Sequence, residues 1–327
     1  MASPPPSTRD PRAALEAGMR HHKSGNLRQA ESLYRQVLAV QPGNPDALYL
    51  FGMLALDAGR PADAATQIAK AIKRRRKVPH YHVALGDAYR AQGKPREAAA
   101  CYRKALALDP KSAAAHFNLA TVRHAENKLA DAIVHYRRAI AIAPDLAEAH
   151  NNLGVALTDE GRRNEAGEHF RRAVALRPDY ADAYLNLGQA LRTEGHLDEA
   201  IAAYEKALEL DPRLVEAHNN LGNALRDAGR PEAAVERYER ALAIRPDYAE
   251  AHNNLGVALG DLGHTEEAVA AHRRALELQP DWTDAHAGLG AALQVLGRIE
   301  EAIAHYERAL DLDPDHARAH HNLAMAR

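Results

Sequence analysis

The chain has 327 residues, a formal net charge of −2 and a single cysteine, so an internal disulfide framework is excluded. No apolar run approaches the roughly 20 residues of a membrane span, and residues 1–10 lack the basic and apolar regions of a secretory signal. These features predict a soluble cytoplasmic protein. Arginine outnumbers lysine and alanine is abundant, which favours a bacterial source with a GC-rich genome.

The charge is unevenly distributed along the chain. Residues 1–110 contain 18 Lys and Arg against 9 Asp and Glu, which gives +9. The remaining residues contain 24 against 35, which gives −11. This asymmetry can orient a partner along the chain, although it does not identify one.

A period of 34 residues organises the sequence. Alanine stands nine times at this spacing, and proline keeps the same step eight times and fails only at Arg76. A fixed period of this length indicates a repeat architecture. Stacked repeats form extended surfaces more readily than enclosed catalytic pockets. The alanines are Ala30, Ala64, Ala98, Ala132, Ala166, Ala200, Ala234, Ala268 and Ala302.

Residues 147–180 show how the first half of a repeat is expected to fold. Leu153 and Leu157 belong to an apolar face with the three- and four-residue steps of an amphipathic helix. Gly161, at repeat position 15, then interrupts the pattern. Glycine accepts the left-handed backbone at a helix C-terminus, and so does Asn127, which replaces it in one repeat.

The second half of the same repeat predicts a second helix, from about Asn164 to Leu176. Pro178 ends it, because proline cannot continue a helix. Small residues in both helices, such as Gly154, let the helix axes approach closely. A large residue at position 24, here Phe170, fills the space that they leave. Each repeat is therefore predicted to be two antiparallel helices joined by a short turn.

The residues that carry the period in this repeat are Leu153-Gly154, Ala166, Phe170, Ala173 and Pro178. Their order and spacing resemble the tetratricopeptide repeat. His150 replaces the tryptophan usual at position 4, and Leu157 replaces the tyrosine usual at position 11. The resemblance implies an all-α fold, a right-handed α-solenoid (superhelix) of helix-turn-helix repeats over residues 11–327. The repeats begin at residues 11, 45, 79, 113, 147, 181, 215, 249 and 283, with a half repeat from 317.

The two ends of the chain are expected to differ from the array. Residues 1–10 are predicted to be a disordered segment, with Asp10 as the N-cap of the first helix and Pro11 at its first position. At the other end, the last helix carries apolar Leu323 and Met325 and has no partner helix, so it is a poor cap for a solenoid. We therefore expect the natural polypeptide to continue beyond Arg327.

Asparagine recurs on the first helices, which are expected to line the concave face. It is a poor residue for a helix interior, so its repetition at one exposed position needs a reason. A carboxamide both donates and accepts hydrogen bonds, so it can pair with a peptide backbone. Helices about 8–10 Å apart match about three extended residues of roughly 3.3 Å each. The candidate peptide-binding residues are Asn118, Asn152, Asn186, Asn220, Asn254 and Asn322 at position 6, and Asn151, Asn219 and Asn253 at position 5.

The alternative is that these asparagines were copied with the repeats and are solvated without a role. Their ladder, with the phrase Ala-His-Asn-Asn-Leu-Gly at 149–154, 217–222 and 251–256, resembles the repeat region of protein O-linked N-acetylglucosamine transferases. In that family an asparagine-lined superhelix holds protein substrates for a separate glycosyltransferase domain, which these residues do not contain.

Two functions therefore remain open at this stage. The first is a non-enzymatic protein-interaction scaffold whose groove binds an extended peptide or a partner protein. The second is the substrate-recruiting arm of a glycosyltransferase, associated in trans or through a continued chain.

Charged residues do not indicate other partners. Position 2 is acidic in the middle repeats, as at Glu148 and Glu216, whereas domains that clamp chaperone C-termini need basic groove residues. The run from Lys73 to Lys77 closes a second helix, where cations favour the helix dipole. Nucleic-acid binding requires a longer basic track with stacking aromatics, so we predict none.

Histidine and cysteine do not form a predicted site either. Successive position-4 histidines, such as His116 and His150, lie a whole repeat apart, whereas ligands of one zinc lie about 2 Å from the ion. They are expected to replace the packing aromatic. Cys101 has no glycine elbow or oriented base beside it. We predict no catalytic residue, no cofactor and no metal site.

Overall fold

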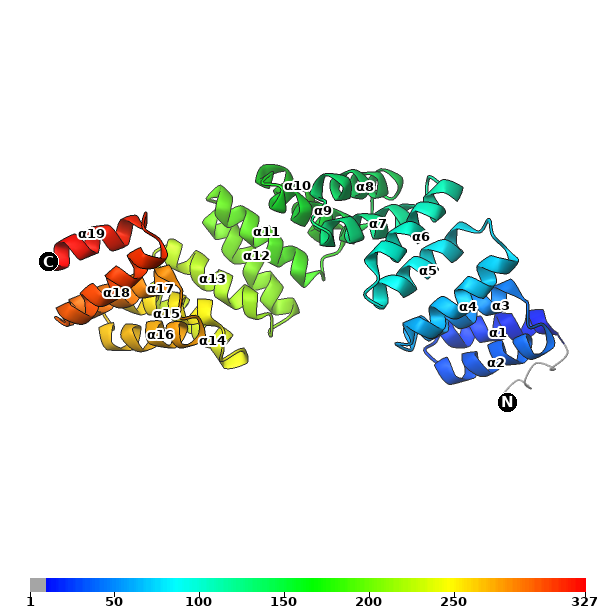
Figure 1. The fold of residues 1–327 in the computed structure, drawn as a ribbon, viewed down its shortest axis with the longest axis horizontal. Helices are drawn as coiled ribbons and strands as arrows, with labels where there is room; N and C mark the ends of the chain where they lie inside the picture. Colours follow the sequence, from blue (N-terminus) through cyan, green and yellow to red (C-terminus); the bar gives the residue numbers. More distant parts are fainter. Residues whose placement is uncertain (1–9) are drawn as a thin grey trace. The chain divides into compact units, whose positions relative to one another are not determined.

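The computed structural model of the protein describes residues 10–327, which form nineteen α-helices and no strand (Figure 1). The predicted disordered segment lies, apart from Asp10, outside the described residues. Asp10 is the N-cap of the first helix, as predicted, because its side chain accepts a hydrogen bond from the backbone N–H of Arg12 at 2.9 Å. Pro11 occupies the first helical position.

The described helices belong to two compact bodies, which divide at Arg162 and Arg163. The N-terminal body contains α1 (Pro11–Lys23), α2 (Leu27–Val40), α3 (Pro45–Asp57), α4 (Pro61–Arg74), α5 (Pro79–Ala91), α6 (Pro95–Leu108), α7 (Ala113–Ala125), α8 (Leu129–Ile142) and α9 (Ala147–Asp159). The C-terminal body contains α10 (Arg163–Leu176), α11 (Ala181–Glu194), α12 (Leu197–Leu210), α13 (Val215–Asp227), α14 (Pro231–Ile244), α15 (Ala249–Asp261), α16 (Thr265–Leu278), α17 (Thr283–Val295), α18 (Ile299–Leu312) and α19 (Ala317–Ala326).

Within each body, consecutive helices pack against each other in chain order. The odd-numbered helices are the first helices of the repeats, and the even-numbered helices are the second. The backbone of each first helix also approaches that of the next first helix of its body, whereas the backbones of the second helices among residues 10–327 stay further apart. The first helices therefore form the inner layer of each stack, and the second helices form the outer layer.

The turn inside each repeat depends on a residue with a left-handed backbone, as the sequence predicts. The eight glycines at position 15 have φ between 70° and 85°, and Asn127 has φ of 56°. A Cβ atom added to any of these glycines would meet nothing within 4 Å. The backbone conformation, rather than crowding, is therefore what selects glycine here.

A different glycine, at position 8 of the first helix, makes room for the large residue of the second helix. Tyr102 is fully buried, and a Cβ atom added to Gly86 would lie 2.4 Å from its Cε1. A Cβ atom added to Gly222 would likewise lie 2.5 Å from Cε1 of Tyr238. The small residues thus do what the period predicts, since they bring two helices close enough for one aromatic ring to fill the gap.

Candidate peptide-binding groove

The position-6 asparagines lie on the inner layer of both bodies. In the N-terminal body they are Asn118 on α7 and Asn152 on α9, and in the C-terminal body they lie on α11, α13, α15 and α19. All six are half-buried. Because neighbouring first helices are in contact and carry the same position, the amides within each body follow one another along one face.

Asn118 is held by a polar network that joins two repeats. Its Nδ2 donates to Asp87 Oδ1 at 2.8 Å, and the hydroxyl of Tyr102 donates to the same oxygen at 2.7 Å. Burial raises the pKa of the Asp87 carboxyl, and the Tyr102 hydrogen bond and the Arg90 charge oppose that rise. The bond to Asp87 takes one N–H of the Asn118 amide. The second N–H and the carbonyl oxygen are the groups that a ligand can use.

Other position-6 asparagines lie beside the tyrosine of the preceding repeat. Burial raises the pKa of Tyr136, and the amide of Asn152 opposes that larger effect. Burial likewise raises the pKa of Tyr306, and the amide of Asn322 opposes it. Both tyrosines stand at position 24, and Tyr306 also contacts the position-8 glycine of its repeat, Gly290. These two amides therefore lie against the repeat core.

The position-5 asparagines are buried, which the sequence did not indicate. Asn219 is 0% exposed; it donates to Glu250 Oε1 at 3.0 Å and accepts from Asn254 Nδ2 at 3.1 Å. Asn151 and Asn253 are only 5% and 7% exposed. Because a peptide cannot reach amides that are covered in this way, the candidate contacts are restricted to position 6. The position-5 residues support them from behind.

The break in the asparagine ladder at Gly288 has a steric cause. His272 replaces the tyrosine of position 24 in the preceding repeat, and a Cβ atom added to Gly288 would lie 2.6 Å from its Cε1. The Nδ1 of His272 also contacts Asn253 Oδ1 at 3.1 Å. The imidazole therefore occupies the space that an asparagine side chain needs.

The position-4 histidines are packing residues, as predicted, and they also bind the backbone. His116 Nε2 lies 3.2 Å from the carbonyl oxygen of Pro110, and His218 Nε2 lies 3.1 Å from that of Pro212. Because a carbonyl only accepts, these nitrogens carry the proton. The signal in the sequence was the constant six-residue step from position 32 to the histidine. The same contact, at 2.7–3.2 Å, is made by His82, His116, His150, His218, His252, His286 and His320.

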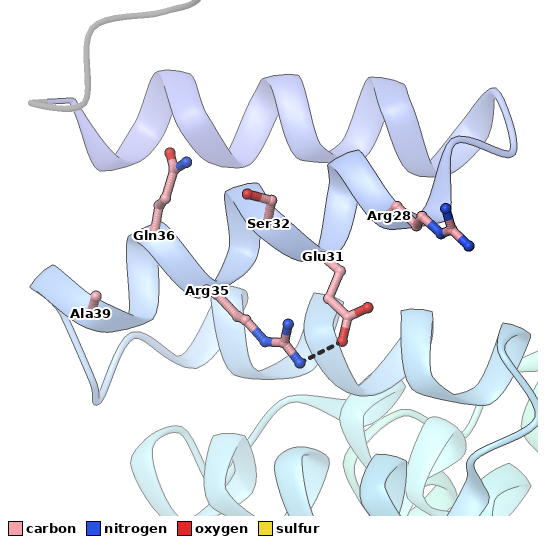
Figure 2. A pocket seen from close by; sticks show the side chains of 6 residues that line it. All are labelled: Arg28, Glu31, Ser32, Arg35, Gln36 and Ala39. Atoms are coloured by element: carbon pink, nitrogen blue, oxygen red, sulfur yellow. Dashed lines mark ion pairs between the residues drawn. The ribbon is translucent and has the colours of Figure 1, made fainter.

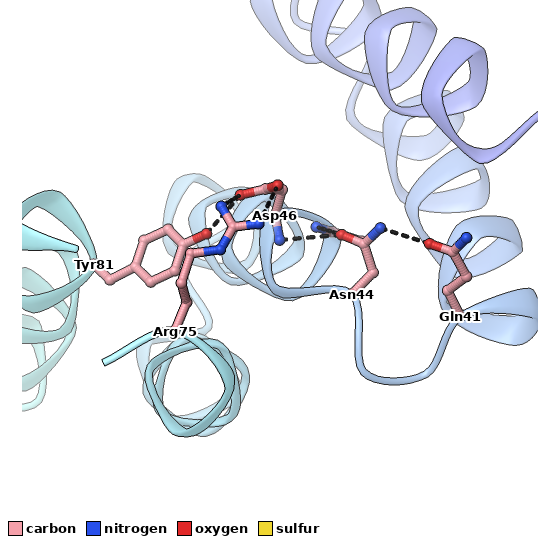
Figure 3. Close-up of polar contacts among 6 residues, drawn as sticks. Gln41, Asn44, Asp46, Arg75 and Tyr81 are labelled. Atoms are coloured by element: carbon pink, nitrogen blue, oxygen red, sulfur yellow. Dashed lines mark hydrogen bonds and ion pairs between the residues drawn. The ribbon is translucent and has the colours of Figure 1, made fainter. Parts of the chain in front are cut away.

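Part of the basic run is structural. Arg75 binds both carboxylate oxygens of Asp46, at 3.0 and 3.3 Å, and the hydroxyl of Tyr81 donates to the same side chain at 2.7 Å (Figure 3). Asn44 caps α3 beside them and contacts Gln41. Asp46, the acidic residue at position 2 of this repeat, is therefore already paired with Arg75 and Tyr81.

Two further features of the N-terminal body lie away from the asparagine face. A hollow of about 480 Å³ on α2, shown in Figure 2, is lined by Arg28, Arg35 and Glu31, among others. Its Glu31 is already paired with Arg35 at 2.8 Å and with Arg60 at 3.3 Å. Cys101 is buried, and burial raises the pKa of its thiol.

Among residues 10–327, no group of three or more His, Cys, Asp or Glu side chains is placed to hold a metal ion. None of the helices in this range is long and apolar enough to cross a membrane.

Family models match nearly the whole chain. Models described as tetratricopeptide repeat or TPR repeat match residues 21–86, 83–147, 156–192, 188–229, 222–263, 249–281 and 295–327. This chain belongs to the tetratricopeptide repeat family. No curated protein matches this tetratricopeptide repeat chain.

Solved structures of other tetratricopeptide repeat proteins are similar. The crystal structure of YrrB, described as a TPR protein with an unusual peptide-binding site, has 26% identity and a TM-score of 0.51 over 57% of this chain and 96% of that chain. The Cut9–Hcn1 hetero-tetramer of the APC/C has 17% identity and a TM-score of 0.61, over 91% and 59% of the two chains. PilF of Pseudomonas aeruginosa has 24% identity and a TM-score of 0.57, over 63% and 94%. The last two similarities show the fold alone.

Proposed function

We propose that the protein is an interaction scaffold whose inner face binds an extended peptide segment of a partner protein. The observation that carries the proposal is the row of half-buried position-6 amides on successive first helices. Asn118 is oriented by Asp87 and Asn254 by Asn219, and a carboxamide has more hydrogen-bonding groups than that anchoring uses. The peptide-binding site named for YrrB, a relative of the same fold, supports the same class of function.

The test uses a peptide that is identified by cross-linking in the source cell and then synthesised. Replacing Asn152, Asn186, Asn220 and Asn254 together by alanine is expected to weaken its binding by about tenfold or more, since each lost hydrogen bond contributes roughly 0.5–1.5 kcal/mol. Asn164, which is exposed at the start of a second helix, provides the matched control, and Asn164→Ala should bind normally. Isothermal titration calorimetry measures the affinities, and circular dichroism checks that helicity holds.

A second arm tests how the amides bind. If they pair with the peptide backbone, N-methylation of single peptide bonds should weaken binding with a period of about three residues, the extended length that matches one helix spacing. Unchanged affinity of the fourfold variant, or side-chain dependence without any N-methyl effect, would contradict backbone pairing.

A substrate-recruiting role beside a glycosyltransferase is the second candidate, and the repeated phrase at 149–154, 217–222 and 251–256 favours it. It predicts that the cross-linked proteins include a nucleotide-sugar-dependent transferase and its glycosylated substrates. Recovery of partners that carry no sugar, and of no transferase, favours the plain scaffold.

A further inference from the structure

A cavity of about 440 Å³ opens between α6, α7 and α8 of the N-terminal body. It is lined by Arg103, Arg123 and Arg138, by two histidines and by the single carboxylate of Asp131. Neither Arg103 nor Arg138 has a carboxylate partner among the described residues. Three arginines against one aspartate leave the lining with two positive charges before the histidines are considered.

The equivalent cavity of the C-terminal body shows that this charge is not a consequence of the architecture. It has about 740 Å³ and lies between α14, α15 and α16, at the same repeat positions. There Glu239 replaces Arg103, and Leu259 replaces Arg123. Three glutamates and one arginine give that lining two negative charges. A cavity therefore lies at the same repeat positions in both bodies. Arg138 corresponds to Arg274, which lines the second cavity too, whereas Arg103 and Arg123 have no basic counterpart there.

The N-terminal cavity also contains two imidazoles, and the protonation of one of them should depend on whether an anion is bound. The Nδ1 atoms of His116 and His135 lie 2.9 Å apart, and the Nε2 of His116 is occupied by the carbonyl of Pro110. His116 therefore donates through Nε2 and accepts through Nδ1, so His135 supplies the Nδ1–H. Burial, then the His116, Arg138 and Arg123 charges, lower the pKa of His135, and Asp131 opposes them. An anion beside it would reverse that effect and let His135 take up a second proton.

We propose that this cavity binds a phosphate monoester or inorganic phosphate, held by the guanidinium groups of Arg103 and Arg138. Planar guanidinium groups bind phosphate oxygens in pairs, and arginine is preferred where an oxyanion is recognised. The third arginine, Arg123, is held by its ion pair with Glu126 at 2.7 Å. Its lining comes from α6, α7 and α8 and does not include Asn118, so the site is separate from the position-6 asparagines and does not depend on the peptide-binding proposal.

The experiment titrates the full chain with inorganic phosphate at constant ionic strength, which is set with chloride. It follows heat by calorimetry and the imidazole resonances of His116 and His135 by NMR. We expect saturable binding that shifts both imidazoles, and loss of affinity of about tenfold or more in the double variant Arg103→Glu, Arg138→Glu. The control Lys73→Glu, Arg76→Glu changes the net charge equally at exposed residues of the basic run and should bind phosphate as the parent does.

Further titrations distinguish the sources of the phosphate. A phosphoserine peptide that binds more tightly than inorganic phosphate, while its unphosphorylated form does not bind, identifies a phosphorylated partner. Equal affinity for the phosphoserine peptide and for inorganic phosphate identifies free phosphate as the ligand. The proposal is overturned if phosphate causes no shift beyond that of chloride, or if Arg103→Gln, Arg138→Gln, folded by circular dichroism, binds as tightly as the parent.

Discussion

At the scale of single residues, His272 shows how one substitution changes its surroundings. It occupies the position that tyrosine holds in most repeats, it is 2% exposed, and it fills the space beside Gly256 and Gly288. Burial, together with the charge of Arg318, lowers its pKa from 6.5 to about 4. The neutral imidazole is therefore part of the core, and a protonated one is not tolerated there.

This burial predicts acid sensitivity at one residue. Below pH 6.5 the unfolded chain protonates His272 before the folded chain does, so stability falls as the pH falls from 6.5 towards 4. The loss due to this group should reach on the order of 2 kcal/mol at pH 5. The variant His272→Tyr carries the residue found in most other repeats. Between pH 7 and pH 5 its free energy of unfolding should fall by about 2 kcal/mol less than that of the parent. Urea unfolding at both pH values measures the difference, and parallel losses in the two proteins would contradict the assignment.

The same scale shows what the sequence could not reveal. The recurrence of Asn219 and Asn220 side by side suggested two similar groove residues, yet one is fully buried and the other half-buried. Adjacent residues on a helix point about 100° apart, and only the packing of the next first helix decides which is covered. The His116–His135 pair likewise depends on how two helices meet.

At the scale of elements, the 34-residue period predicts the helix bounds well because every repeat forms the same pair of packed helices. Apolar steps, the turn residue and the proline predicted the second helix of residues 147–180 to begin at Asn164, one residue after the observed start at Arg163. What the pattern left open was which glycines are needed for the backbone and which for space. The structure separates the two kinds: a Cβ atom at a position-8 glycine such as Gly86 or Gly222 would collide with the side chain at position 24, whereas one at position 15 would meet no atom within 4 Å.

Two helical glycines of the C-terminal body test whether crowding is what selects glycine at position 8. Gly222→Ala places a Cβ atom 2.5 Å from the ring of Tyr238, so it should destabilise the protein by about 1–3 kcal/mol through overpacking. Gly260→Ala, in the neighbouring first helix α15, meets no atom within 4 Å and should stabilise the protein by about 0.5–1 kcal/mol through helix propensity. Urea midpoints of the two variants should therefore move in opposite directions. If Gly260→Ala also destabilised the protein, crowding by Tyr238 would not explain the effect of Gly222→Ala.

At the scale of the whole molecule, the charge asymmetry coincides with the division into bodies. Residues 1–162 carry 24 Lys and Arg against 15 Asp and Glu, or +9, and residues 163–327 carry 18 against 29, or −11. The two bodies share a fold and differ in net charge. The N-terminal body offers a cationic cavity between second helices, whereas the first helices of the C-terminal body begin with acidic residues such as Asp182, Glu216 and Glu250.

The acidic inner layer predicts the charge of the peptide that the C-terminal body recruits. Glu216 is paired with Arg245 at 2.8 Å and Glu250 accepts from Asn219, but the net charge of this body remains −11. A basic peptide should therefore associate faster than its acetyl-lysine form, and raising the salt from about 0.05 to 0.5 M should slow its association by on the order of tenfold. Dissociation should change less, because the field acts mainly on the encounter, whereas in the proposed complex hydrogen bonds to the asparagines hold the bound segment. Stopped-flow fluorescence measures both rates. Equal association of the two peptides at low salt would mean that the acidic layer does not select the ligand.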